Sequence, residues 1–174
     1  MIELNKQIGK VDSGLLASYI LYKIGPISHL KLHKLLYYVQ AFHLAYFDDV
    51  IIDDEFEAWV HGPVIRNLFY TLRDIEARLY DLVDYNGKVG DPTPEGQLQD
   101  KIIPDQIELI DDILDEYGKL SSLQLETLTH SELPWQSARV GLDISESCSK
   151  IISRDLMRDF YNKQIYGEEK TQTQ

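Results

Sequence analysis

The chain has 174 residues, 44% of them hydrophobic, and a formal net charge of −12 at pH 7. This length suits one compact domain with its own core, and the hydrophobic content excludes wholesale disorder. The acidic balance argues against binding to a nucleic-acid backbone, which requires clustered Lys and Arg. The single cysteine, Cys148, excludes an intrachain disulfide and a Cys-based zinc site.

Neither end of the chain nor its apolar segments suggest a membrane. Residues 1–6 lack the apolar core of a signal peptide, and no apolar run approaches the length needed to cross a bilayer. A chain that can form no internal disulfide fits a reducing compartment. We therefore expect a cytoplasmic protein that contacts neither membrane nor nucleic acid.

Two helices are predicted at the start of the chain. The first begins near Asp12 or Ser13, both good N-caps, and stops at Gly25-Pro26. The second begins after Ser28 and is the expected central core helix. Its apolar face is predicted from side chains that recur at steps of three and four residues, namely Leu32, Leu35, Leu36, Val39, Phe42, His43 and Tyr46.

An extended segment is predicted next. Residues 50–52 are β-branched, and apolar and polar residues alternate over positions 56–61. We expect two short strands joined by a turn at Asp53-Asp54. Gly62 then ends the extended segment, and Pro63 suits the first position of a third helix that runs toward residue 82.

The second half of the chain is predicted to be helical after a loop at residues 86–94. Pro104 opens an amphipathic helix, and further helices start at Ser121-Ser122, at Pro134-Trp135 as a short turn, and near Ser153. Residues 167–174 have nothing to bury and are expected to form a flexible tail. The predicted fold is mainly α: a single compact helical domain over residues 1–166, with a small β-hairpin inserted between the second and third helices.

Histidines at two positions suggest a metal site. His29 and His33 have the four-residue spacing that places two imidazoles on one helix face. The sequence offers no third ligand nearby, and Lys31 and Lys34 are unfavourable neighbours for a cation. We predict packing or surface roles for these histidines, a hydrogen-bonded core position for His43, and neither a metal nor a cofactor.

Glu57 and His61 are the strongest candidates for catalysis. A histidine held by a carboxylate can act as a general base, but no nucleophile motif accompanies this pair. The simpler interpretation is that Trp59 and His61 lock the hairpin against the following helix. We predict a protein without enzymatic activity, and the alternative is a small-ligand-binding or hydrolytic domain that uses Glu57 and His61.

The hairpin region is strongly acidic, and no Lys or Arg occurs from residue 35 to 65 to offset it. Its carboxylates are Asp48, Asp49, Asp53, Asp54, Glu55 and Glu57. Such a surface is expected to attract a basic partner and to speed the encounter. The predicted helix after Pro104 has a second acidic face, made of Asp105, Glu108, Asp112, Asp115 and Glu116, for which simple solvation is our preferred interpretation.

Several segments resemble a known family. KLHKLLYYVQAFHL at residues 31–44 is similar to the KLQKLLYYAQAWHL segment of the Panacea, or SocA-like, antitoxin domain, and EAWVHGPV at residues 57–64 resembles its EAWxxGPV segment. Residues 120–139 resemble its LS…L…LTH…PW…AR stretch, and residues 151–156 its entry to the last helix. The match spans nearly the whole chain, although Arg66 stands where the family often has a proline.

The resemblance implies a mostly helical antitoxin of a bacterial or phage toxin–antitoxin system, which neutralises a cognate protein toxin by direct contact. One subfamily instead acts as an adaptor that delivers its toxin to a protease. For this chain the alternative partner is therefore a protease such as a ClpXP-type machine. The toxin's identity and the oligomeric state stay open. We predict that the partner-binding residues are Asp53, Asp54, Glu55, Glu57, Trp59, His61 and Arg66.

Overall fold

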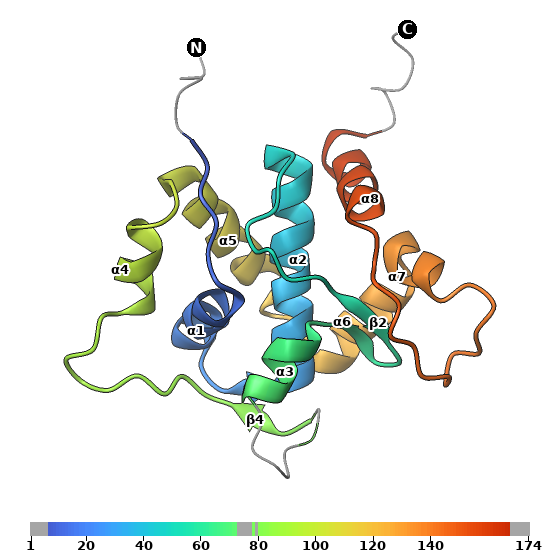
Figure 1. The fold of residues 1–174 in the computed structure, drawn as a ribbon, viewed down its shortest axis with the longest axis horizontal. Helices are drawn as coiled ribbons and strands as arrows, with labels where there is room; N and C mark the ends of the chain where they lie inside the picture. Colours follow the sequence, from blue (N-terminus) through green and yellow to red (C-terminus); the bar gives the residue numbers. More distant parts are fainter. Residues whose placement is uncertain (1–6, 73–77, 79, 168–174) are drawn as a thin grey trace, which may run out of the picture.

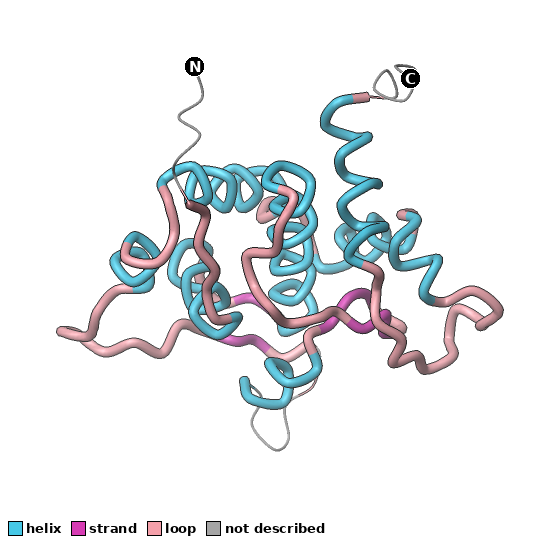
Figure 2. The backbone as a smooth tube through the Cα atoms, turned by 45° about the horizontal axis from the view of Figure 1, so that its top comes forward, coloured by secondary structure: helices cyan, strands magenta, loops and turns pink. Residues whose placement is uncertain are grey.

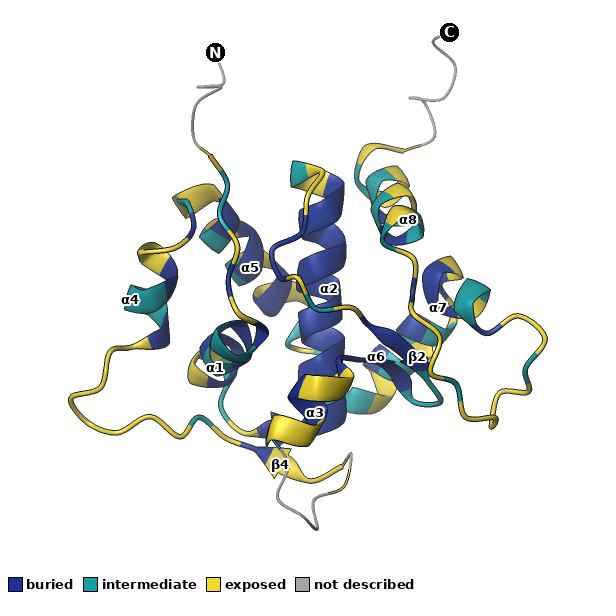
Figure 3. Ribbon diagram, in the orientation of Figure 1, coloured by how far each residue is buried: buried dark blue, intermediate teal, exposed yellow. Residues whose placement is uncertain are grey.

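The computed structural model describes residues 7–72, 78 and 80–167, which form eight helices and four short strands (Figure 1). Helix α2 (His29–Phe47) lies at the centre, with the other helices arranged around it. Every residue from 32 to 45 is buried, so α2 is enclosed on all sides rather than on one face (Figure 3). The predicted class, mainly α with a small β-hairpin, is confirmed.

Five helices begin close to where their capping residues predict. Asp12 caps α1 (Ser13–Ile24), Ser28 caps α2, Ser121 caps α6 (Ser122–His130) and Ser153 caps α8 (Arg154–Tyr166), in each case by accepting a hydrogen bond from a backbone N–H of the first turn. Pro104 opens α5 (Pro104–Tyr117), as expected for proline at a first helical position. Helices α1, α5, α6 and α8 all pack on α2.

Three short elements depart from the predictions. Helix α4 (Pro94–Gln99) begins where a loop was expected to end, with Thr93 as its cap. Strand β1 (Ile27–Ser28) pairs antiparallel with β4 (Leu82–Val83), so the prediction of a helix running toward residue 82 is wrong. Helix α3 is described over Arg66–Leu72, and residues 73–77 and 79 lie outside the described residues. Helix α7 (Leu133–Ala138) is the short turn predicted at Pro134.

The hairpin exists, but its predicted position is wrong. Strands β2 (Glu57–Trp59) and β3 (Gly62–Val64) pair antiparallel, so the turn is at Val60-His61 rather than at Asp53-Asp54. Pro63 therefore lies in a strand and not at a helix start. The two small sheets, β1–β4 and β2–β3, are separate and appear as the magenta segments of Figure 2.

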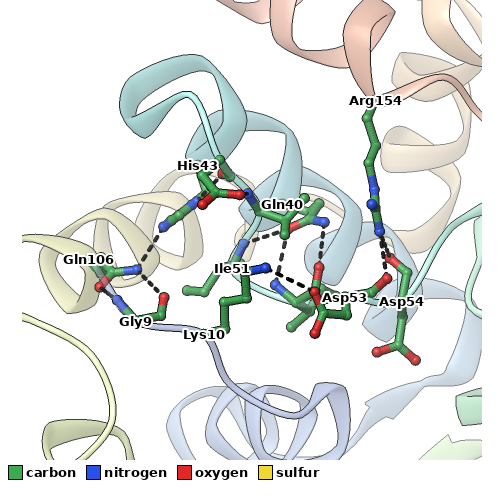
Figure 4. Close-up of polar contacts among 12 residues, drawn as sticks. Gly9, Lys10, Gln40, His43, Ile51, Asp53, Asp54, Gln106 and Arg154 are labelled. Atoms are coloured by element: carbon green, nitrogen blue, oxygen red, sulfur yellow. Dashed lines mark hydrogen bonds and ion pairs between the residues drawn. The ribbon is translucent and has the colours of Figure 1, made fainter. Parts of the chain in front are cut away.

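Residues 50–52 are buried without forming a strand because a side chain of α2 satisfies their backbone. The Oε1 atom of Gln40 accepts hydrogen bonds from the N–H groups of Ile51 (3.0 Å) and Ile52 (3.3 Å), and its Nε2 donates to the carbonyl of Ile52 (2.9 Å), as Figure 4 shows. A buried amide thus replaces the partner strand that the β-branched sequence suggests.

His43 has the predicted core position and is hydrogen-bonded at both ring nitrogens. Its Nδ1 lies 2.6 Å from the carbonyl oxygen of Asp49, and its Nε2 lies 2.8 Å from the amide nitrogen of Gln106. The ring therefore donates through Nδ1 and accepts through Nε2, which is the neutral tautomer. Burial lowers the pKa of His43, in agreement with that state.

The C-terminal half of the core contains a buried carboxylate held by tyrosines. Glu132 accepts hydrogen bonds from the hydroxyls of Tyr38 and Tyr161 (3.0 Å for Tyr161), and Tyr38 stacks on Tyr117 with 4.4 Å between ring centroids. Burial raises the pKa of Glu132. This cluster joins α2, α5 and α8 to the start of α7. Within the described ranges, no helix combines the length and apolar character needed to cross a membrane.

Candidate partner-binding site

The seven predicted partner-binding residues surround the hairpin and line two neighbouring hollows. A groove of about 490 Å³ is lined by Trp59, Val60, His61, Arg66 and the segment 147–149. A hollow of about 380 Å³ is lined by Asp53, Asp54, Glu55, Glu57, Ile65, Arg66, Asn67, Ile151 and Arg154. Arg66 lines both, so the two form one continuous region, which we call the hairpin surface.

Glu57, Trp59 and Arg66 form a connected group at the centre of the hairpin surface. The Nε and Nη2 atoms of Arg66 each donate to one carboxylate oxygen of Glu57 at 2.8 Å, and the Trp59 Nε1 donates to Glu57 at 3.1 Å. The hydrogen bonds from Arg66 hold the pKa of Glu57 below its usual range. Because both oxygens of Glu57 are engaged, this carboxylate is a fixed structural anion.

His61 is paired with a different carboxylate from the one expected. Its Nδ1 lies 3.0 Å from Oε1 of Glu126 on α6, while Glu57 is bound to Arg66. The Glu57–His61 pair that a hydrolytic site would need is therefore not formed. Trp59 meets Phe69 of α3 edge to face at 5.4 Å, in line with the expectation that it packs against the following helix. His61 instead joins the hairpin turn to α6.

The acidic residues of this region are offset by cations from distant parts of the chain, which the sequence pattern does not predict. Lys10 lies 3.2 Å from the Asp53 carboxylate, and Arg158 lies 3.4 Å from that of Asp48. The Nη2 atom of Arg154 donates to the backbone carbonyls of Asp53 and Asp54 (Figure 4). The prediction of an acidic hairpin without nearby positive charge is thus wrong for the folded chain.

Two side chains that sequence reasoning missed hold the hairpin backbone. Arg139 is buried and donates to the carbonyls of Ala58 (2.8 Å) and Glu146 (2.6 Å), and the Trp135 Nε1 donates to the carbonyl of Trp59 (3.0 Å). The Arg139 guanidinium also lies 5.0 Å from the ring of Trp135. These contacts fix segment 147–149 beside β2 and so build one wall of the groove. The "PW…AR" motif was the available signal, but it gave no indication of this role.

Lys34 lies beneath the hairpin and is fully buried. Within the described residues its Nζ has no hydrogen-bond partner, and burial lowers its pKa to about 8, partly offset by the carboxylate of Glu126. Its Cε would be 2.8 Å from a Cβ placed on Gly62, whose φ is +121°. Gly62 is therefore needed both for its backbone conformation and for the close approach of Lys34.

The paired histidines of α2 are buried packing residues. His33 accepts a hydrogen bond from the backbone N–H of Ile65 through Nδ1 (3.1 Å), and burial lowers its pKa to about 3. His29 meets the ring of Phe69 edge to face at 5.5 Å. In the part of the chain that the structure describes, no three His, Cys, Asp or Glu side chains come together as a metal site.

Comparison with known proteins agrees with this architecture. The family model described as "Antitoxin SocA-like, Panacea domain" matches residues 32–136, which include most of α2, the hairpin and the motif residues Pro134 and Trp135. No curated protein and no solved structure gives a significant match to the chain. The family match covers more than half of the sequence, and the protein therefore belongs to the SocA-like Panacea antitoxin domain family.

Proposed function

We propose that this chain neutralises a cognate protein toxin by direct binding, and that the hairpin surface is the docking site. The observation that carries the proposal is the partly exposed Trp59, which is held in place by Glu57, Arg66 and Phe69 beside an open groove. Aromatic and arginine side chains in such positions often dominate the binding energy of protein interfaces. A side chain that is already fixed loses little conformational entropy when a partner binds.

Asp54 and Glu55 supply the charge that steers the partner. Both line the hollow next to Arg66, and within the described residues neither carboxylate forms an ion pair. Their field remains available to a basic partner, whereas that of Asp53 is shared with Lys10. We expect these two residues to raise the association rate at low salt more than they lower the dissociation rate.

The proposed activity requires no catalysis by this chain. Glu57 is an ionised carboxylate with both oxygens engaged, and His61 is bound to Glu126. Because Arg66 and Trp59 occupy both of its oxygens, Glu57 is not free to take a proton from a substrate in this arrangement, and the contact of His61 with Glu126 uses Nδ1 alone. We propose a non-enzymatic antitoxin that acts by occupying the toxin's surface.

Co-expression with the toxin encoded beside this chain tests the proposal. We expect Asp54→Lys/Glu55→Lys and, separately, Trp59→Ser to abolish rescue from toxicity while the purified variants stay folded. The matched control is Asp100→Lys/Asp115→Lys, which makes the same charge change at exposed positions away from the hairpin surface. Undiminished rescue by both hairpin variants would exclude this surface as the docking site.

The fate of the toxin separates direct neutralisation from delivery to a protease. Sequestration predicts that the toxin accumulates as an inert complex, with a half-life equal to or longer than that of the free toxin. An adaptor for a ClpXP-type machine predicts a shorter half-life when this chain is present. The measurement is a chase of tagged toxin with and without the chain, in cells with and without the protease.

A further inference from the structure

A second groove lies between α2 and α5. Helix α5 and the hairpin lie on opposite sides of α2 (Figure 1). Its volume is about 640 Å³, and it shares no lining residue with the hairpin surface. The floor is apolar and aromatic and includes Phe42, Phe47, Leu109 and Ile113. Tyr46, which the sequence pattern places on the core face of α2, instead lies at the rim with 49% of its surface exposed.

One wall of this α2–α5 groove is a row of carboxylates. They are Asp105, Glu108, Asp112 and Glu116, all exposed on α5. Their steps of three and four residues place them on one face of the helix, over a length of about 16 Å at 1.5 Å per residue. Among the residues that the structure describes, no Lys or Arg lines the groove.

These carboxylates differ from those hairpin carboxylates that cations from elsewhere in the chain neutralise. Within the described residues, none of the four forms an ion pair, whereas Asp48, Asp53 and Glu57 each have one. Lys31 approaches α5 only past its C-terminal end, where it donates to the carbonyl of Gly118 (2.8 Å). An apolar floor beside an uncompensated row of negative charge is complementary to a ligand that is both basic and amphipathic.

We propose that the α2–α5 groove is a second docking surface, which takes a cationic amphipathic helix of a protein partner. A helix lying alongside α5 repeats its side chains with the same 5.4 Å pitch, so Lys or Arg on successive turns would meet successive carboxylates. Its apolar side chains would cover Phe42, Phe47 and the ring of Tyr46. This surface is separate from the hairpin surface and does not depend on the toxin binding there.

Other occupants fit the charge less well. A second copy of this chain carries the same net charge of −12, which disfavours self-association through an acidic face. Nucleic acids and anionic lipid surfaces are repelled by the same row of carboxylates. A basic amphipathic helix is complementary both to the apolar floor of the groove and to its row of carboxylates.

The test uses the full chain and a fluorescein-labelled peptide of about 18 residues, built from Lys on one helical face and Leu on the other. Anisotropy is measured in about 50 mM salt, where surface charge is screened less than at physiological salt. We expect saturable binding, no binding of the same peptide with Glu in place of Lys, and at least about tenfold weaker binding to Asp112→Lys. Asp115→Lys is the matched control, because Asp115 is exposed on the same helix but does not line the groove.

A second variant tests the floor without changing charge. Tyr46→Ser is expected to weaken binding about threefold to tenfold, and peptide-induced NMR shifts should fall on α5 and the C-terminal end of α2. Equal loss in Asp112→Lys and Asp115→Lys would show attraction by net charge alone and would overturn the proposal. So would NMR shifts confined to the hairpin surface, the absence of saturable binding, or salt-sensitive self-association of the chain that Asp112→Lys abolishes.

Discussion

The hairpin surface and the α2–α5 groove look alike in sequence, since each contains a run of Asp and Glu, but the fold treats their charges differently. At the hairpin, Arg66 neutralises Glu57, and Lys10 shares the charge of Asp53. Along α5 the carboxylate row has no cation among the described residues. The ion pair of Glu57 with Arg66 fixes the position of Glu57, to which the Trp59 ring donates a hydrogen bond. Unpaired carboxylates instead produce an electrostatic field that attracts a basic partner from a distance. The two surfaces are thus suited to different tasks.

The largest effect is expected at the residue that holds the hairpin backbone. Arg139→Met leaves the carbonyls of Ala58 and Glu146 without their donor, and we expect unfolding in urea to require about 3 kcal/mol less free energy. The control is Arg158→Met, which removes exposed ion pairs and should cost less than about 1 kcal/mol. Similar losses in the two variants would mean that the hairpin is not organised by a buried cation.

Replacing Lys34 should raise the free energy of unfolding rather than lower it, because Lys34 is a buried cation without a hydrogen-bond partner among the described residues. Its pKa is about 8 in the folded chain and near 10.5 when exposed, so the unfolded chain binds the proton more tightly. The resulting destabilisation is complete below pH 8 and disappears as pH rises toward 10.5. We expect Lys34→Met to be more stable than the parent by about 2 kcal/mol at pH 7, with the difference gone above pH 10.5.

Denaturation of the parent, Lys34→Met and Lys31→Met at a series of pH values measures this difference. Burial also lowers the pKa of Lys31, but this side chain is only half-buried and donates to the carbonyl of Gly118, so its replacement should give a smaller gain. Other lysines and tyrosines titrate in all three proteins and cancel. A Lys34→Met variant that is less stable at pH 7 would show that the ammonium group is paired beneath the hairpin.

The sequence predicts those parts of the fold that local chemistry determines. Capping by Asp12, Ser28, Ser121 and Ser153 involves residues two or three positions apart, so it can be inferred without tertiary structure. The displaced hairpin depends instead on Gln40, whose side chain satisfies residues 51 and 52. A polar residue such as Gln40 within a buried helix gives no indication, in the sequence, of which backbone groups it will bind.

The candidate site was predictable as a region but not as a set of contacts. The seven residues expected to bind a partner do gather around one surface, because they are close in sequence and lie on or beside one hairpin. Glu57, Trp59 and Arg66 bind one another, but three other contacts come from 43 to 101 positions away: Lys10 for Asp53, Glu126 for His61, and Arg154 for the carbonyl of Asp53. Charge counted along the chain therefore misidentified which acidic surface is uncompensated.

A smaller effect is expected from removing the anion at the centre of the hairpin surface. Glu57→Gln replaces a bidentate, charge-assisted contact with Arg66 by a neutral one, and we expect a loss of about 1 kcal/mol at pH 7. Because the pKa of Glu57 is lowered on folding, its contribution is present above the unfolded-state pKa and is lost as pH falls through the folded value. Parent and variant should therefore converge in acid. The matched control is Glu55→Gln at an exposed position of the same segment, which should change the free energy of unfolding by less than about 0.5 kcal/mol at pH 7.

The smallest expected effect concerns the loss of folding stability caused by the unpaired carboxylates of α5. Asp112 is four residues from both Glu108 and Glu116, and like charges at that spacing destabilise a helix by a few tenths of a kcal/mol per pair. We expect Asp112→Asn to raise the free energy of unfolding by about 0.5 kcal/mol at low salt, and the gain to shrink as salt is added. Asp115→Asn should give a smaller gain, because within α5 only Asp111 lies four residues from it. If the gain at Asp112 survives high salt, it does not come from repulsion. If it is seen at low salt and lost at high salt, the chain maintains a repulsive row of carboxylates at a cost in stability, which is the behaviour expected of a surface shaped for binding rather than for folding.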